Sequence, residues 1–141
     1  MSSADIDEIV AAFAAAAKRA EQAGFDGVQL HGAHGYLINQ FLSPLCNQRQ
    51  DSYGGSFENR LGFLQDVLAA VRSAVGNDYP VTSKLTAADH LEGGLQPRDC
   101  VAIAKRLNES GIDAIEVSSG TAVSGALGPA RQKIDTAAQE A

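Results

Sequence analysis

The chain has 141 residues, of which 45% are hydrophobic and 20% are charged, a composition typical of a globular protein of one domain. Its 17 acidic and 11 basic residues give a formal net charge of -6 without a basic patch, which excludes nucleic acid and anionic membrane surfaces as expected partners. No apolar run is long enough to span a bilayer, and Met1–Asp5 lacks the basic and apolar segments of a signal peptide, so we expect a cytoplasmic protein.

The start of the chain predicts an amphipathic helix followed by a strand. Apolar side chains recur at helical spacing, Asp5 and Glu8 are placed to form a capping pair, and Gly24 is a typical stop signal. The apolar positions are Ile6, Ile9, Val10, Phe13, Ala14 and Ala17. Residues 25–31 then form a short, largely apolar run that predicts a buried strand, which opens into a polar loop rich in glycine.

The same order of helix and strand repeats twice more. A second helix over residues 61–75 is followed by a strand over 81–86. A third helix begins at Pro97 and stops at Gly111, before a third strand over 112–118. The side chains that this helix is predicted to turn inward are Val101, Ala104 and Leu107.

Strands separated by helices predict parallel pairing with right-handed crossovers, and therefore an α/β fold. Periodicity alone leaves open a doubly wound sheet or a (β/α)₈ barrel. A complete barrel needs about 250 residues, so the length predicts a fragment of one domain with about three βα units and uncovered sheet edges. Residues 119–141 are expected to form an irregular tail, in which residues 131–141 begin another helix.

Polar residues gather where the predicted strands end, which is where parallel α/β folds bind their ligands. His31, His34 and Tyr36 follow the first strand, and this pattern suits two hydrogen-bond donors for an oxygen anion beside a phenol that delivers a proton. The same histidines are equally suited to bind a metal, with Asp89 or His90 as the third ligand of a hydrolase barrel. A third interpretation gives them no chemistry, and the spacing leaves all three open.

A long ordered run over residues 23–60 adds a second observation. Its segments are A-G-F-D-G-V at 23–28, H-G-A-H-G-Y-L at 31–37, Q-F-L-S-P at 40–44, N-Q-R at 47–49, D-S-Y-G-G-S at 51–56 and E-N-R at 58–60. The run resembles the Old Yellow Enzyme family of NAD(P)H:flavin oxidoreductases, and the resemblance continues more loosely to Gly120. It implies a partial TIM (β/α)₈ barrel, in which residues 1–141 belong to a single FMN-binding domain and supply its fourth to sixth strands.

The resemblance also implies an activity and a set of site residues. The protein would use FMN, with NADH or NADPH as hydride donor, to reduce activated C=C bonds in small molecules such as enones and enals. His31 and His34 would bind the electron-withdrawing oxygen of the alkene, and Tyr36 would protonate its α-carbon. Lys84 matches the place of a basic residue, commonly Arg, at the pyrimidine edge of the flavin, and no metal ligand is assigned.

Two hypotheses of other classes remain beside this one. The first is a metal-dependent TIM-barrel hydrolase that uses His31, His34 and Asp89. The second is an inactive barrel fragment, a non-catalytic module that folds only by pairing with another copy or with missing segments. Because the resemblance implies strands that this chain lacks, we expect the isolated chain to be inactive and to form homo-oligomers or aggregates.

Overall fold

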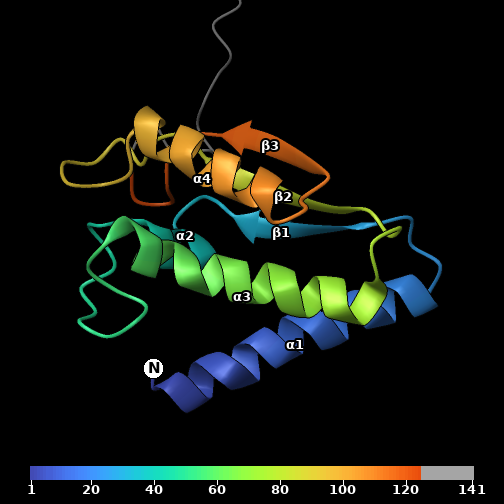
Figure 1. Ribbon diagram of the computed structural model, residues 1–141. Coiled ribbons are helices and arrows are strands. Elements are labelled where there is room, and N and C mark those ends of the chain that lie inside the picture. The colour runs from blue at the N-terminus through green and yellow to red at the C-terminus, as the bar shows by residue number, and fades with distance from the viewer. Residues whose placement is uncertain (125–141) are drawn as a thin grey trace, which may run out of the picture.

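The computed structural model describes residues 1–124, in which helices precede and separate three strands (Figure 1). In chain order the elements are α1 (Ser3–Gln22), β1 (Val28–Gly32), α2 (Leu37–Leu42), α3 (Phe57–Val75), β2 (Val81–Thr86), α4 (Pro97–Glu109) and β3 (Ala114–Ser118). The predicted start of a helix at residues 131–141 lies outside the described residues. Among the helices of residues 1–124, none is both long enough and apolar enough to cross a bilayer.

The three strands form one parallel sheet in the order β1-β2-β3, with a helix in each connection. This arrangement confirms the predicted α/β class. Within the described residues, β1 and β3 each pair with β2 alone, apart from an isolated bridge between His34 and Thr121. The sheet therefore keeps two open edges, as a segment cut from a closed barrel would.

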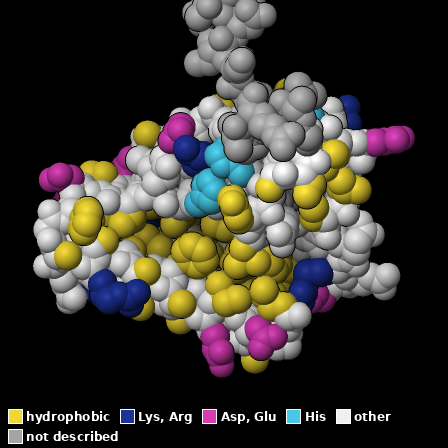
Figure 2. Space-filling view, turned by 180° about the vertical axis from the view of Figure 1, so that it is seen from behind, with side chains coloured by type: hydrophobic (Ala, Val, Ile, Leu, Met, Phe, Trp, Pro, Cys, Tyr) yellow, Lys and Arg dark blue, Asp and Glu magenta, His cyan; other side chains and the backbone are white. Residues whose placement is uncertain are grey.

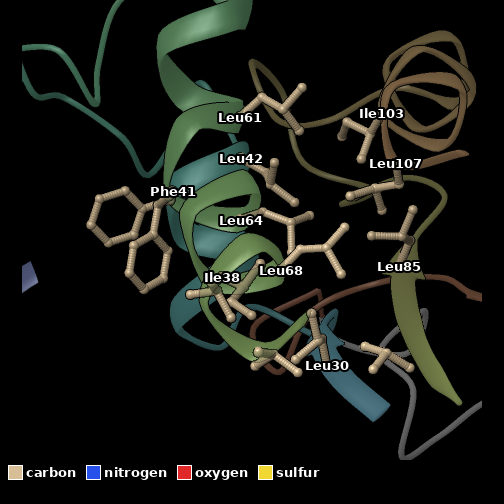
Figure 3. Close-up of a cluster of buried hydrophobic side chains, with 14 of the residues drawn as sticks. Leu30, Ile38, Phe41, Leu42, Leu61, Leu64, Leu68, Leu85, Ile103 and Leu107 are labelled. Atoms are coloured by element: carbon tan, nitrogen blue, oxygen red, sulfur yellow. The ribbon is translucent and has the colours of Figure 1, made fainter. Parts of the chain in front are cut away.

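The hydrophobic core lies between one face of the sheet and helices α2, α3 and α4 (Figure 3). Leu30 of β1 and Leu85 of β2 pack there with leucines of α3 and with Ile103 and Leu107 of α4. Helix α1 lies alongside α3, and its Ile6 is fully buried (Figure 1). Burial of each large aliphatic side chain contributes about 1.5–3 kcal/mol, so the core on this face of the sheet is the main source of the segment's stability.

Strand alternation leaves the other face of the sheet polar and open. Val81, Ser83 and Leu85 of β2 are buried on the helix side, whereas Thr82 and Lys84 between them are only partly covered. The pairing register aligns Lys84 with exposed residues of both neighbouring strands. In a closed barrel this second face is the interior, so the groups that it carries are available for a site.

Two predicted features of the helices are wrong in detail. Helix α1 begins at Ser3, so Asp5 forms its capping box with Ser2, and Glu8 takes no part in it. In α4 the buried stripe contains Cys100, Ile103 and Leu107, and Val101 is 56% exposed. One residue along a helix turns a side chain by about 100°, which carries Val101 away from the stripe that faces the sheet.

Strands β1 and β3 begin later than predicted, and one helix was not predicted. Strand β1 begins at Val28, because Gly24 turns the chain at φ +82° and leaves Phe25 exposed in the approach to the sheet. Strand β3 likewise begins at Ala114. Helix α2 occupies part of the loop that the glycines suggested, and its six residues are too few to establish a helical period from sequence.

Candidate active site

A polar row crosses the open face of the sheet. The register aligns His31 of β1 with Lys84 of β2 and Glu116 of β3. Lys84 Nζ lies 2.8 Å from Glu116 Oε1, and Gln29 Nε2 donates to Glu116 Oε2 at 3.1 Å. These hydrogen bonds, that of Lys84 first, lower the pKa of Glu116, so the carboxylate stays ionised. Lys84 has three N–H donors and gives one to this pair, which leaves the others for a ligand on the same face.

The loop after β1 brings the two predicted histidines and the tyrosine together. The rings of His31 and His34 have centroids 5.1 Å apart, and the His31 and Tyr36 centroids are 5.3 Å apart. Figure 2 shows histidine side chains exposed together beside an apolar surface, on the side of the molecule opposite to that of Figure 1. The two donors and the phenol can therefore reach the same small ligand.

A sharp backbone turn makes this arrangement possible. His34 has φ +65° and Gly35 has φ +79°, so two successive residues adopt the left-handed conformation that a side chain rarely accepts. Just before the turn, Gly32 lies so close to β2 that a Cβ there would stand 2.9 Å from the Lys84 carbonyl oxygen. The glycines of the H-G-A-H-G segment thus let the loop fold back over the end of the sheet.

The His34 ring is partly buried and lies against β3, with Nε2 2.7 Å from Ser118 Oγ. Burial lowers the pKa of His34, positive charge on His31 and Lys84 lowers it further, and Glu116 acts in the opposite direction. The imidazole is therefore neutral at neutral pH and carries a single N–H. Because the Ser118 hydroxyl can donate or accept, it is able to select the ring nitrogen that carries this proton.

Tyr36 is the N-cap residue of α2, and it is 59% exposed. Its side chain makes no capping hydrogen bond to the helix. The phenol is therefore committed to no role in the local structure, and it stands at the mouth of the polar face beside His31.

Asp89 and His90, the candidates for a third metal ligand, are engaged elsewhere. Asp89 is 1% exposed and accepts hydrogen bonds from the side chains of Asn39 and Ser43, and His90 Nε2 lies 2.5 Å from Ser119 Oγ. Within residues 1–124, no three His, Cys, Asp or Glu side chains are placed to hold one ion. The donor geometry in this part of the chain therefore gives the hydrolase hypothesis no third ligand.

Several polar residues around this site were missed from the sequence. Gln29 and Glu116 lie on the inward-facing positions of strands, where simple alternation could have indicated them. Asn39 and Thr86 are buried beneath the histidine loop, and no sequence period indicates that they contact it. Only the fold, which joins α2 to the end of β2, reveals this second group.

Comparison with known proteins finds relatives of nearly the whole chain. The model of the NADH:flavin oxidoreductase / NADH oxidase family matches residues 1–139. The chain is 52% identical over 123 residues to the NADPH dehydrogenase of Geobacillus sp. (strain WCH70), which covers 87% of this chain and 36% of that protein. It is 47% identical over 116 residues to the NADH oxidase of Thermoanaerobacter brockii, with 82% and 18% covered.

Solved structures agree with these sequence matches. Morphinone reductase in complex with tetrahydroNAD superimposes with a TM-score of 0.74 and 35% identity, covering 83% of this chain and 33% of that one. A complex of 2-naphthoyl-CoA reductase with 2-naphthoyl-CoA gives a TM-score of 0.82 and 36% identity, covering 86% and 19%. The three parallel strands thus match part of a TIM barrel, as predicted, and the chain spans about a third of the NADPH dehydrogenases that it matches.

Proposed function

Because the chain belongs to the NADH:flavin oxidoreductase / NADH oxidase family, the Old Yellow Enzyme family, we propose that it forms part of an FMN-dependent NAD(P)H oxidoreductase that reduces activated C=C bonds. The observation that carries this proposal is the grouping of His31, His34 and Tyr36 at the carboxyl end of β1. Relatives named NADPH dehydrogenase and NADH oxidase support a nicotinamide nucleotide as the hydride donor. A small unsaturated carbonyl compound is the proposed substrate.

The histidine pair suits the electron-withdrawing oxygen of such a substrate. Hydride addition to the β-carbon of an enone places negative charge on the carbonyl oxygen, and two N–H donors fixed beforehand stabilise this charge. Neutral His34 supplies one N–H, and the exposed His31 ring, whose centroid lies 5.1 Å from that of His34, supplies the other. Both donors are anchored to the sheet, so little reorganisation is needed as the charge develops.

Tyr36 suits the second half of the addition. The enolate carbon must receive a proton, and a phenol at the edge of the site can supply it and then recover one from solvent. The 59% exposure of Tyr36 leaves this return path open.

Lys84 and Gln29 suit the flavin. The pyrimidine edge of a flavin presents oxygen and nitrogen acceptors, and the open face of the sheet presents the free N–H groups of Lys84 beside the Gln29 amide. When bound, reduced FMN supplies the hydride. Lys84 would hold positive charge near the edge that gains electron density, although an ammonium lacks the planar fork of the more usual arginine.

A ligand-binding experiment tests the oxygen site in the full-length protein that carries this segment. Phenols resemble an enolate, so replacing His31 and His34 together by Ala should weaken their binding by at least about 10-fold, since one charge-assisted hydrogen bond is worth about 1.5–3 kcal/mol. His90→Ala is the matched control, because His90 also follows a strand but bonds to Ser119. Unchanged phenol affinity in the double variant would refute the oxygen site.

A substrate experiment tests the reaction itself. The bound flavin, identified by mass after release, should be FMN, and NADPH or NADH should bleach it under anaerobic conditions. Cyclohexenone should then restore the oxidised spectrum, whereas cyclohexanone, which lacks the C=C bond, should not. A protein that binds no flavin, or a reduced flavin that cyclohexenone leaves unchanged, would contradict the proposal.

A further inference from the structure

A buried carboxylate lies beneath the histidine loop. Asp89 is 1% exposed, yet it forms no ion pair within the described residues. Its Oδ2 accepts hydrogen bonds from Ser43 Oγ at 2.7 Å and from the Leu95 backbone N–H at 2.9 Å. Its Oδ1 accepts from Asn39 Nδ2 at 3.3 Å. A buried carboxylate is costly unless such donors satisfy it, so its donors are held in fixed positions.

The hydrogen bonds continue from Asp89 to the backbone of His34 in one direction. Because Asn39 points its amide nitrogen at Asp89, its Oδ1 faces the other way and accepts from the Thr86 hydroxyl at 3.1 Å and from the Gly35 N–H at 2.7 Å. The Thr86 hydroxyl in turn accepts from the His34 N–H at 2.8 Å. The carboxylate thus fixes which end of the Asn39 amide is the acceptor. The backbone N–H groups of His34 and Gly35 then have acceptors in fixed positions.

Of these two residues, His34 is the one whose conformation needs external support. A left-handed conformation costs a residue with a side chain about 1–2 kcal/mol, and His34 adopts it at φ +65°. The conformation sets the direction in which the ring leaves the backbone, and the ring then reaches Ser118 Oγ. If the N–H groups of His34 and Gly35 lost their acceptors, the loop could relax and move the ring.

We propose that Asp89, Asn39 and Thr86 are positioning residues, which hold His34 in the strained conformation that presents its imidazole to the substrate oxygen. They act through the backbone of the loop and touch no substrate. The inference rests on the proposed function, because it assumes that His34 binds an oxygen ligand. It goes further by assigning the geometry of that donor to a buried network that joins α2 to the loop after β2.

Thr86→Val tests this assignment in the full-length protein. Valine keeps the shape of threonine but neither accepts from the His34 N–H nor donates to Asn39. Thr86→Ser keeps the hydroxyl. Ser83→Ala is the matched control, because Ser83 is another buried hydroxyl of β2 that faces the helices and bonds to the Leu30 carbonyl oxygen at 3.3 Å. The readouts are the dissociation constant for a phenol, the rate of flavin reduction by NADPH and the melting temperature.

We expect Thr86→Val to weaken phenol binding by about 10-fold or more, while Thr86→Ser and Ser83→Ala stay within about 3-fold of the parent. Flavin reduction by NADPH should change little in Thr86→Ser and Ser83→Ala, because both variants leave the network that holds His34 intact. If Thr86→Val loses no more affinity than Ser83→Ala, the network is merely structural and the inference is wrong. If Thr86→Val does not fold, Asp89→Asn is measured in its place with the same expectation, because an amide oxygen cannot accept all the hydrogen bonds of the carboxylate.

His34→Ala separates the two levels of the argument. If His34→Ala binds the phenol as tightly as the parent, the proposed oxygen site fails. If His34→Ala weakens binding but Thr86→Val and Asp89→Asn do not, the oxygen site stands and only the positioning network fails.

Discussion

Replacement of Tyr36 by phenylalanine should separate the two half-reactions of the proposed enzyme. Tyr36 is 59% exposed and its side chain makes no capping hydrogen bond, so loss of the hydroxyl should change stability by less than about 0.5 kcal/mol. Phenylalanine keeps the ring beside His31. Loss of a positioned general acid typically costs about 10²–10⁴-fold in rate, which corresponds to about 3–5 kcal/mol of activation free energy. Tyr36→Phe should therefore lower the rate of alkene reduction without weakening the fold.

Stopped-flow absorbance measures each half-reaction separately in the full-length protein. Flavin reduction by NADPH uses no proton from Tyr36 and should proceed at nearly the parental rate. Reoxidation by an enone should slow by about 10²-fold or more, whereas a quinone, whose reduction needs no protonation at carbon, should be affected much less. Equal slowing of both half-reactions, or an unchanged rate with the enone, would show that Tyr36 is not the proton donor.

Three other predictions concern stability and assembly. Arg72→Met should lower the free energy of unfolding by roughly 2 kcal/mol, because Arg72 donates hydrogen bonds to the carbonyls of Gly111 and Tyr79 and to Asp113. A denaturant titration of the full-length protein measures this, and a change within about 0.5 kcal/mol would contradict a stabilising role for Arg72. Hydrogen bonds from the backbone N–H of Val81 and then from Arg72 lower the pKa of Asp113 in the folded state. The stability that ionised Asp113 contributes is therefore present above its pKa in the unfolded chain and is lost as pH falls through its pKa in the folded protein. The difference in melting temperature between the parent and Asp113→Asn should accordingly shrink below about pH 4. The isolated 141-residue chain should bind FMN weakly or not at all and should associate through its open sheet edges, so a monomer that retains stoichiometric FMN through gel filtration would contradict this expectation.

Much of the fold could be predicted because the segment is regular. Helix α3, with apolar side chains at helical spacing, and the strand β2 that follows it repeat the order found around α1 and β1, and strand β2 has the predicted bounds of 81–86. Element ends were less predictable. The start of β1 depends on a turn at Gly24 and on where Val28 finds its partner Val81, and pairing partners far apart in sequence leave no local pattern.

Spacing predicted the site only to the extent that its residues are neighbours in sequence, and Lys84 was assigned to it through the resemblance. His31, His34 and Tyr36 share one loop, and the structure places their rings together. Their substrate and proton-transfer roles stay predictions, as does the role of Lys84. Asn39 and Asp89 lie 50 residues apart in sequence and meet only after α2 folds against the end of β2. Partners of this kind are set by tertiary packing, which no spacing rule encodes.

The two faces of the sheet differ in how complete they are, and this difference bears on what the segment can do alone. On the helix side Leu85 is 1% exposed, while Val117, its partner on the edge strand β3, is 62% exposed. On the inner side the polar row is open along its length. The Asp89 network lies inside the completed part, so the geometry of the histidine loop depends on contacts that this segment already contains. Closure of the barrel would then be needed to enclose the flavin and exclude water. It would not be needed to shape the proposed oxygen site at His31 and His34.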